Sequence, residues 1–457
     1  MFPANFVWGA AAAAYQVEGG YNADGRGLSV WDAFAHRPGK TFNGHTGDIA
    51  CDHYHRYTED VALMQEIGLH AYRLSLSWSR ILPHGIGQVN EQGLDFYDRL
   101  IDQLLEKNIQ PYVTLFHWDF PLALYQRGGW LNRESSNWFA EYTQVVTRAL
   151  GDRVRYWMTM NEPAVFTVLG HLSGIHAPGD MLSPADGFRI AHHVLMAHGK
   201  ASQVIRSANP ESKISIANNG RVGIPHTRSD ADIAAARQFM FDTTTPELWH
   251  INWWSDPIMF GAYPAEGLKT VEAMLPAGFE KDMPVIHQPY DFFGLNIYWG
   301  TEVRADGSQG YSQIPRHAGS PITAFHWDIT PEGLYWGPRF LYERYKLPVV
   351  ITENGLSNSD WVQQDGKVHD PQRIDYTARH LQQFSQAYQD GTEIGGYFHW
   401  SIMDNFEWAE GMKHRFGMIY VDYPSQKRIL KQSAYWYRDV IRSNGHALAS
   451  GNGSNGG

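Results

Sequence analysis

Short β-rich runs that alternate with longer segments of helical period constrain the fold of this chain most strongly. The β-rich runs lie at residues 6–11, 71–77, 112–116, 154–160, 213–217, 292–297, 349–352 and 396–400. Apolar residues recur every three or four positions in the segments 58–67, 93–106, 134–150, 185–207, 230–241, 331–345, 371–389 and 432–442. Such alternation favours a parallel sheet, and eight strands are the number that closes a barrel. We expect an α/β fold, a single (β/α)8 TIM barrel with elaborated βα loops.

A doubly wound sheet is the main alternative for this alternation. Its first strand would lead into a glycine-rich phosphate-binding turn, but residues 15–20 read Tyr-Gln-Val-Glu-Gly-Gly and lack the G-x-G-x-x-G spacing. No repeat of 20–50 residues and no interior linker divides the chain. We therefore expect one catalytic barrel over residues 1–445, followed by a disordered tail rich in Gly, Asn and Ser over residues 446–457.

Charge and cysteine content exclude several classes of protein. The net charge is −11 and no block of Lys or Arg stands out, which argues against nucleic acid and anionic membrane as partners. Cys51 is the single cysteine, so an intrachain disulfide framework is excluded. The first residues lack a basic region followed by an apolar core, and no apolar run is long enough to span a membrane. We expect a soluble cytoplasmic protein.

Two glutamates stand where predicted strands end. Glu162 follows the run at 154–160, and Glu353 follows the run at 349–352; turn-forming residues come directly after each. A carboxylate at such a position projects from a strand tip and does not fill a core. Two such carboxylates are what the hydrolysis of a glycosidic bond by an acid and a nucleophile requires.

Other polar and aromatic residues also mark strand ends. They are Gln16, Arg73, His117, Trp118, Asn161, Asn296, Tyr298, Trp400 and Glu407. In a parallel barrel these residues would face one mouth, where the active sites of this fold lie. Aromatic residues make up 14% of the chain, and their flat faces pack against the C–H faces of sugar rings. The pattern indicates a carbohydrate site.

A series of short segments carries a family resemblance along nearly the whole chain. They are Phe6-Val7-Trp8-Gly9, Ala14-Tyr15-Gln16-Val17-Glu18-Gly19, Tyr72-Arg73-Leu74-Ser75-Leu76-Ser77-Trp78, Phe116-His117-Trp118-Asp119, Thr159-Met160-Asn161-Glu162-Pro163, His176-Ala177-Pro178-Gly179, Gly294-Leu295-Asn296-Ile297-Tyr298, Thr352-Glu353-Asn354-Gly355 and Trp400-Ser401-Ile402-Met403-Asp404-Asn405-Phe406-Glu407-Trp408. With these segments in this order, the chain resembles glycoside hydrolase family 1, the β-glucosidase family of (β/α)8 barrels.

The resemblance implies a retaining mechanism with Glu353 as nucleophile and Glu162 as acid and base. Arg73 and Tyr298 would bond the nucleophile and keep it ionised, while the pKa of Glu162 would be raised. The residues expected to bind the substrate are Gln16, His117, Trp118, Asn161, Asn296, Tyr298, Trp327, Trp400, Glu407, Trp408 and Phe416. Among them, Gln16 and Glu407 would bond the 4- and 6-hydroxyls, and Trp327 would contact the leaving group.

The implied activity is that of a β-glucosidase acting on cello-oligosaccharides and on aryl or alkyl β-glucosides, as in cellulose degradation. Glu407 favours an unphosphorylated sugar and Glu162 favours O-glycosides. β-Galactosidase or β-fucosidase activity of the same family is the alternative, and a non-catalytic sugar-binding barrel is a more remote one. A metal-dependent hydrolase would use Cys51, His53 and His55, but the pattern matches no established zinc motif. We expect neither a metal nor an organic cofactor.

Overall fold

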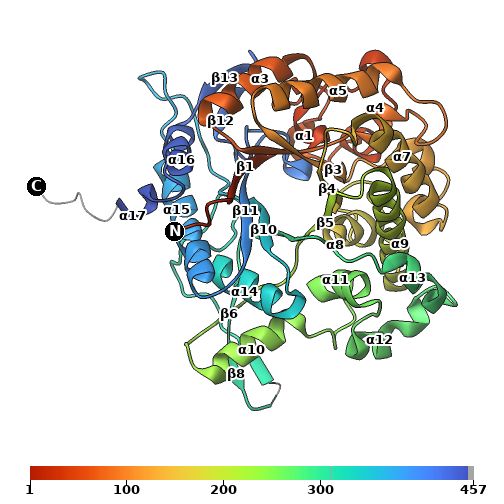
Figure 1. Cartoon of the computed structure of the whole chain (residues 1–457), viewed down its shortest axis with the longest axis vertical. Coiled ribbons are helices and arrows are strands. Elements are labelled where there is room, and N and C mark those ends of the chain that lie inside the picture. Colours follow the sequence, from red (N-terminus) through yellow and green to blue (C-terminus); the bar gives the residue numbers. More distant parts are fainter. Residues whose placement is uncertain (309, 451–457) are drawn as a thin grey trace, which may run out of the picture.

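A closed barrel of eight parallel strands forms the centre of the computed structural model, which describes residues 1–308 and 310–450 (Figure 1). The barrel strands are β1 (Val7–Ala11), β2 (Ala71–Ser75), β3 (Gln110–Phe116), β4 (Tyr156–Asn161), β5 (Lys213–Asn218), β7 (Phe293–Asn296), β10 (Val349–Asn354) and β11 (Ile394–Trp400). Each pairs with the next in parallel, and β11 closes the barrel against β1. The predicted fold class is confirmed, because each predicted run contributes one barrel strand.

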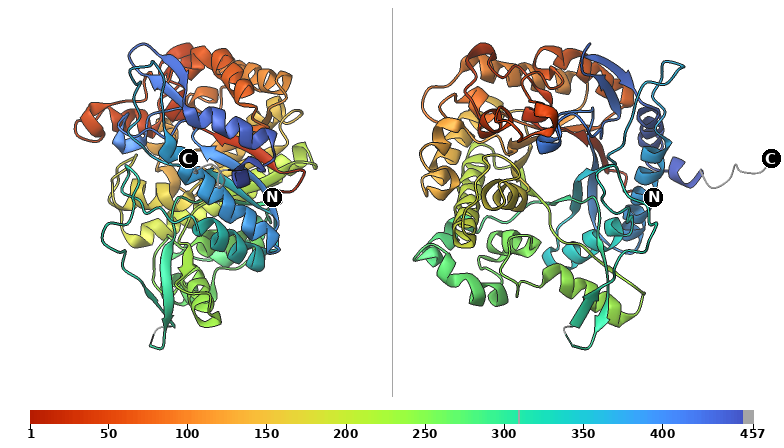
Figure 2. Two further views of the ribbon diagram at one scale, coloured as in Figure 1. Left: turned by 90° about the vertical axis from the view of Figure 1, so that its left-hand side faces the viewer. Right: turned by 180° about the vertical axis from the view of Figure 1, so that it is seen from behind.

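Helices between the strands form the outer layer (Figures 1 and 2). The longer helices are α3 (His53–Ile67), α5 (Glu91–Glu106), α7 (Ser135–Leu150), α9 (Pro184–Ala208), α10 (Asp230–Phe241), α11 (Ile251–Phe260), α14 (Gly333–Tyr345), α15 (Pro371–Gln389) and α16 (Gln432–Arg442). The shorter ones are α1 (Ala14–Val17), α2 (Val30–Ala35), α4 (Trp78–Ile81), α6 (Leu122–Tyr125), α8 (Pro163–Val165), α12 (Ala265–Val271), α13 (Met283–Ile286) and α17 (Ala447–Ser450). The short helices elaborate the loops that the sequence left unassigned.

Two small sheets were not predicted. A three-stranded sheet of β6 (Gly223–Pro225), β8 (Thr301–Asp306) and β9 (Gly310–Gln313) packs beside α10, and a hairpin pairs β12 (Ile419–Asp422) with β13 (Lys427–Leu430). Both belong to loops after barrel strands, and in Figure 2 the β8 hairpin extends beyond the barrel. Strands of three to six residues without a long apolar run give too weak a pattern to be recognised.

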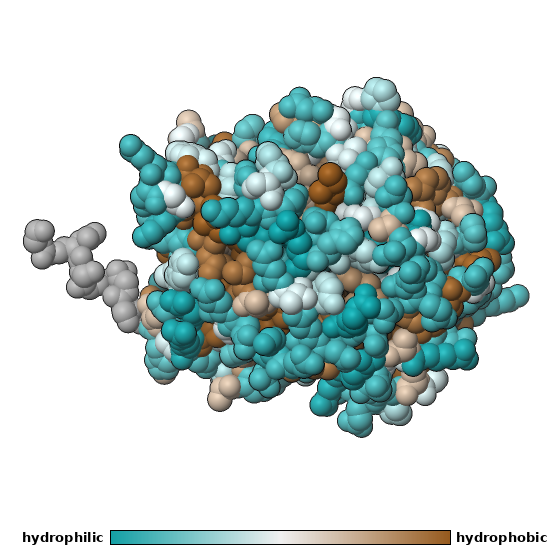
Figure 3. All heavy atoms as spheres, turned by 90° about the horizontal axis from the view of Figure 1, so that it is seen from above, coloured by the Kyte–Doolittle hydropathy of each residue, from teal (hydrophilic) through white to brown (hydrophobic). Residues whose placement is uncertain are grey.

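The outer surface differs from the core in character. The face shown in Figure 3 carries mainly hydrophilic residues, with smaller apolar groups between them. None of the helices within residues 1–308 and 310–450 combines the length and apolar character that crossing a bilayer requires. The tail predicted at 446–457 lies mostly outside the described residues; of its first part, residues 447–450 form α17.

Strand register brings chemically active side chains to one end of the barrel. Ala11 at the end of β1 pairs with Arg73 on one side and with Trp400 on the other. Glu353 pairs with Asn296 after a register shift in β10. Because parallel strands end at the same rim, the polar residues near their carboxyl ends converge there.

Candidate active site

A pocket of about 520 Å³ opens at the carboxyl ends of the strands, and both Glu162 and Glu353 line it. The other predicted site residues that line it are His117, Trp118, Asn296, Tyr298, Trp327, Trp400, Glu407 and Trp408. Four further predicted residues lie behind the wall at no more than 2% exposure: Gln16, Arg73, Asn161 and Phe416. The structure thus brings the whole predicted set together, with some residues in contact with the cavity and others supporting them.

Glu353 is fixed through both of its carboxylate oxygens. Arg73 Nη1 donates to Oε1 at 2.6 Å, and the Tyr298 hydroxyl donates to Oε2 at 2.8 Å. Arg73 is itself buried, and its Nη2 donates to Asn161 Oδ1 at 2.6 Å. Both contacts expected for Glu353 are present, so its carboxylate has one defined orientation.

Asn161 links Arg73 to His117 and thereby defines the state of the imidazole. Its Oδ1 accepts from Arg73 and from Asn296 Nδ2, so its Nδ2 must be the donor that faces His117 Nε2 at 2.9 Å. Burial lowers the pKa of His117 well below its ordinary value, so the ring is neutral. With Nε2 accepting, the proton resides on Nδ1, which has no partner among the described residues. His117 therefore offers one unused donor beside the pocket.

Glu162 lies in a different environment from Glu353. It begins α8 with a left-handed backbone (φ 45°), and no cation pairs with it in the described part of the chain. Burial raises the pKa of Glu162 from 4.5 to about 8, and the charge of Glu353 adds to the rise. Glu162 is thus protonated near neutral pH, in agreement with the direction expected from the sequence.

Burial also raises the pKa of Glu353, a contribution that the sequence analysis left out. The charge of Arg73 and the hydrogen bonds from Arg73 and Tyr298 oppose that rise. Because the direct ion pair belongs to Glu353, the proton that the two carboxyls share is held by Glu162. The two glutamates therefore differ in protonation, as an acid and a nucleophile must.

Glu407 forms a second acidic position, at the side of the pocket supplied by the loop after β11. Gln16 Nε2 donates to its Oε2 at 3.3 Å, and the Trp400 side chain also bonds to it. Burial, followed by the charge of Glu353, raises the pKa of Glu407 to about 8. Gln16 Oε1 has no partner within the described residues, so an acceptor remains free next to this carboxyl.

Aromatic rings form two groups along the pocket. His117 lies between Trp400 and Trp408, with ring centroids 5.9 and 5.8 Å away, and Trp118 contacts Trp408 at 4.5 Å. Toward the opening, Trp327 lies 5.0 Å from the Tyr298 ring. Additional residues that were not predicted from the sequence line the pocket: His176, Asn219, Arg221, Trp249, Trp299 and Phe325. They lie in loops whose paths no periodic pattern specifies.

Cys51, His53 and His55 do not form a common site. Alternate residues share one face only in a strand, whereas His53 and His55 begin helix α3, where residues two apart diverge. Cys51 Sγ donates to the Asp404 carbonyl at 2.9 Å, whereas the two histidines bond to separate aspartates. Across residues 1–308 and 310–450, no group of three or more His, Cys, Asp or Glu side chains could hold a metal ion.

Several known proteins are similar to this chain in sequence and in structure. The model described as "Glycosyl hydrolase family 1" matches residues 1–446. A "1,4-beta-D-glucan glucohydrolase" of Thermotoga neapolitana is 48% identical over 445 residues, covering 97% of this chain and 99% of that protein. An "aryl-phospho-beta-D-glucosidase" of Bacillus subtilis is 40% identical and covers 98% of each chain. The structure "Beta-glucosidase from Thermotoga maritima in complex with glucoimidazole" matches with a TM-score of 0.89 at 47% identity, over 97% of this chain and 99% of that one.

The barrel and its pair of buried carboxyls define a glycoside hydrolase. This chain belongs to glycosyl hydrolase family 1.

The raised pKa of Glu162 predicts a pH-dependent gain in stability for Glu162→Gln. Below pH 4.5 the carboxyl is protonated in the folded and unfolded states alike; as the pH rises to about 8, only the unfolded state ionises freely, and the native protein loses stability. The amide does not titrate, so the free energy of unfolding of Glu162→Gln, relative to that of the native protein, should increase by roughly 1–3 kcal/mol between pH 5 and pH 8. Thermal unfolding at both pH values measures this, with the exposed Glu266→Gln as control. An equal advantage at both pH values would contradict the raised pKa.

Proposed function

We propose that the protein is a retaining β-glucosidase that releases terminal, non-reducing β-D-glucosyl residues, with Glu353 as nucleophile and Glu162 as acid and base. The observation that carries the proposal is the contrast between the two carboxyls. Glu353 is ion-paired to Arg73 and bonded by Tyr298, whereas no cation among the described residues pairs with Glu162, whose pKa is about 8. Retaining glycosidases need this division of roles, with their two carboxyls about 5–5.5 Å apart.

In the first step, Glu353 attacks the anomeric carbon while Glu162 gives its proton to the glycosidic oxygen. The bond to the leaving group breaks, and a neutral ester of Glu353 forms. The charge of Glu353, which contributes to the raised pKa of Glu162, is then gone. Glu162 is left ionised, and its negative charge is tolerated better without the charge of Glu353 nearby. In the second step Glu162 takes a proton from water, and the water oxygen attacks the anomeric carbon. The ester bond to Glu353 breaks, so both carboxyls return to their starting states.

The supporting residues suit a sugar ring at the closed end of the pocket. The Nδ1 donor of His117 and the Oε1 acceptor of Gln16 have no partner within residues 1–308 and 310–450, as expected for groups that bond hydroxyls. Asn161 is proposed to donate to the 2-hydroxyl, where bonding strengthens as positive charge develops on the ring. Trp400 and Trp408 supply flat faces for its C–H groups, Asn296 and Trp118 complete the wall, and Phe416 borders the 6-hydroxymethyl.

The proposed substrates are cello-oligosaccharides and aryl or alkyl β-glucosides. The aromatic lining toward the opening, including Trp327, suits either a second sugar or an aryl leaving group. The Bacillus subtilis relative is named for a phosphorylated substrate, whereas here the ionised form of the buried Glu407 carboxyl would repel a 6-phosphate. β-Galactoside and β-fucoside hydrolysis is the second candidate, since both would use the same two glutamates.

Residues 1–445 are proposed to form one catalytic unit.

Incubation with an activated 2-deoxy-2-fluoro-β-glucoside tests the proposal directly. The fluorine slows breakdown of the glycosyl-enzyme, so a stable adduct on Glu353, located by peptide mass mapping, is expected. The matched galacto analogue is run in parallel. An adduct with the galacto compound alone would favour a β-galactosidase, and no adduct or leaving-group release with either would favour the non-catalytic sugar-binding barrel.

Glu407→Gln should weaken discrimination at the 6-position. With a pKa of about 8 the Glu407 carboxyl is protonated at neutral pH, and its O–H is a stronger donor to a hydroxyl oxygen than an amide N–H. The ratio of kcat/KM for a glucoside to that for its 6-deoxy analogue should therefore fall about tenfold. The comparison uses the same aryl leaving group for both sugars, with Glu343→Gln on the outer helix α14 as control. An unchanged ratio would mean that other residues contact the 6-hydroxyl.

A further inference from the structure

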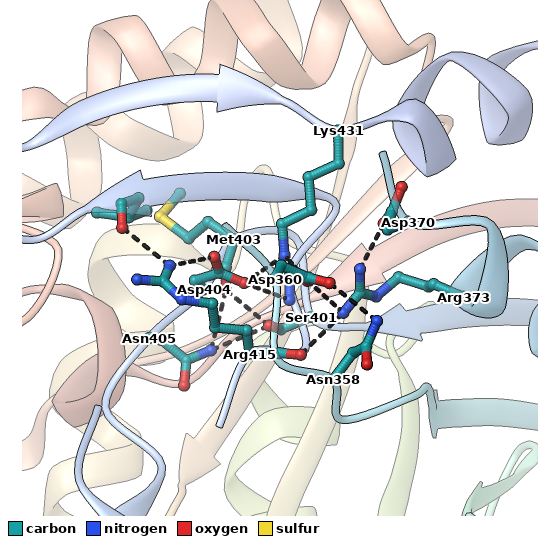
Figure 4. Close-up of polar contacts among 12 residues, drawn as sticks. Asn358, Asp360, Asp370, Arg373, Ser401, Met403, Asp404, Asn405, Arg415 and Lys431 are labelled. Atoms are coloured by element: carbon teal, nitrogen blue, oxygen red, sulfur yellow. Dashed lines mark hydrogen bonds and ion pairs between the residues drawn. The ribbon is translucent and has the colours of Figure 1, made fainter. Parts of the chain in front are cut away.

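Six charged side chains form a buried network that the proposed mechanism does not use (Figure 4). They are Asp360, Asp370, Arg373, Asp404, Arg415 and Lys431, and we call them the buried charge network. Their side chains are at most 15% exposed. Three carboxylates balance three cations, so the network is neutral when all six groups are ionised. Such a concentration of charge requires fixed geometry, because each buried ion needs its partners in place.

Lys431 connects the loops that follow two neighbouring barrel strands. Its Nζ lies 2.6 Å from Asp360, in the loop after β10, and 2.6 Å from Asp404, in the loop after β11. Lys431 itself follows β13 and begins the connection to α16. Arg373 of α15 also contacts Asp360, at 2.7 Å. The two loops are thereby held to each other and to the outer helices.

Asp404 fixes the chain on both sides of Phe416. Its Oδ2 accepts from Arg415 Nη1 at 2.6 Å, and its Oδ1 accepts from the backbone nitrogen of Gly417 at 3.0 Å. The Phe416 ring between these anchors lies 6.2 Å from the ring of Tyr298, which bonds Glu353. The place of Phe416 behind the pocket wall therefore depends on Asp404.

Asn405, next in the chain, fixes the amide of Gln16. Its Oδ1 accepts from Gln16 Nε2 at 3.1 Å, and its own Nδ2 is held by Ser401 Oγ at 3.0 Å. Gln16 Nε2 also donates to the Phe406 carbonyl at 2.9 Å. With only acceptors around Nε2, the amide cannot turn over without losing these bonds. Its Oε1 is consequently kept as the atom available to a sugar hydroxyl.

We propose that the buried charge network positions the closed end of the pocket, with Lys431 as a positioning residue that sets sugar selectivity through Asp404, Asn405 and Gln16. This inference rests on the proposed function. Lys431 contacts neither Glu162 nor Glu353, so it acts on how the 4-hydroxyl and the 6-hydroxymethyl are held and not on bond cleavage itself.

Lys431→Met tests the proposal. Asp360 keeps Arg373 and Asp404 keeps Arg415 in this variant, so each carboxylate retains a cation. We would measure kcat/KM for aryl β-glucoside, 6-deoxy-β-glucoside and β-galactoside with one leaving group. The folded fraction of the preparation cancels in the ratios between substrates. We expect the preference for the glucoside over both analogues to fall at least about fivefold, since small misplacements of binding groups are costly.

Arg344→Met is the matched control. Arg344 pairs with Asp256, which is 4% exposed. Like Lys431→Met, this variant removes a cation that contacts a buried carboxylate, but it does so between α11 and α14, away from the pocket lining. Its substrate ratios should equal those of the native enzyme, whatever stability it loses. If Lys431→Met does not fold, Arg415→Gln, which breaks one contact to Asp404, should shift the ratios in the same direction.

Two outcomes separate the possible failures. Equal loss on all three substrates in the folded variants would overturn the positioning role and leave the network purely structural. A native enzyme that hydrolyses none of the three substrates would overturn the proposed function itself.

Discussion

Glu353→Ala should lose hydrolysis of every β-glucoside, by at least about a thousandfold in kcat, because no other group can form the glycosyl ester. The opposed carboxyl, Glu162, lies on another strand end and holds the proton of the pair. Removal of the side chain also leaves Arg73 buried at 1% exposure without an anion, so the free energy of unfolding should fall as well. Activity on an activated aryl β-glucoside and thermal unfolding are measured together.

Azide separates the chemical loss from the structural one. The cavity left by the carboxylate, lined by the Arg73 guanidinium and the Tyr298 hydroxyl, suits a small anion. Azide should attack the anomeric carbon from that side and give an α-glucosyl azide, with partial recovery of leaving-group release. Glu343→Ala on α14 serves as control and should need no azide. Full activity of Glu353→Ala without azide would remove Glu353 from the proposed mechanism.

Periodic parts of the chain were predictable, and so was the end of the barrel at which the site lies. Glu162 and Glu353 terminate strands whose apolar runs are visible in the sequence, and parallel strands end at one rim whatever their loops do. Their differing environments were harder to foresee. Arg73 meets Glu353 across 280 residues, a contact that the family resemblance implied and that no local pattern encodes.

Loop residues mark the limit of the sequence analysis. Trp249, Trp299 and Phe325 line the outer pocket, but their loops have no periodicity that would direct an aromatic ring toward the cavity. The burial of Lys431 could not be predicted from the sequence either. Lysine side chains are usually exposed to solvent, whereas that of Lys431 is fully buried and pairs with two aspartates from separate loops. The contribution of burial to the pKa of Glu353 was missed for the same reason, because burial is a property of the assembled barrel.

Glu162→Ala should divide substrates by their leaving groups. Proton donation typically contributes about 10²–10⁴-fold, so kcat/KM for cellobiose or an alkyl β-glucoside should fall by that factor. A dinitrophenyl glucoside departs without a proton, and formation of its glycosyl-enzyme should be nearly unchanged. The later attack by water still lacks its base, so the ester on Glu353 should accumulate after a burst of released phenol. Equal losses on both kinds of substrate would contradict the acid role.

The pH profile gives an independent measure on the same variant. Glu162 must be protonated to act as acid, and its pKa is raised to about 8, so the native enzyme should lose kcat/KM for alkyl glucosides as the pH rises through 8. Glu407 titrates in the same range, and it remains in the variant. A dinitrophenyl glucoside needs no proton, so an alkaline loss that Glu162→Ala still shows with this substrate belongs to sugar binding by Glu407. The additional alkaline loss that the native enzyme shows with alkyl glucosides belongs to Glu162. A double variant with Glu407→Gln should then show neither, because both raised carboxyls have been removed and only the ionisation of Glu353 still limits the reaction at low pH.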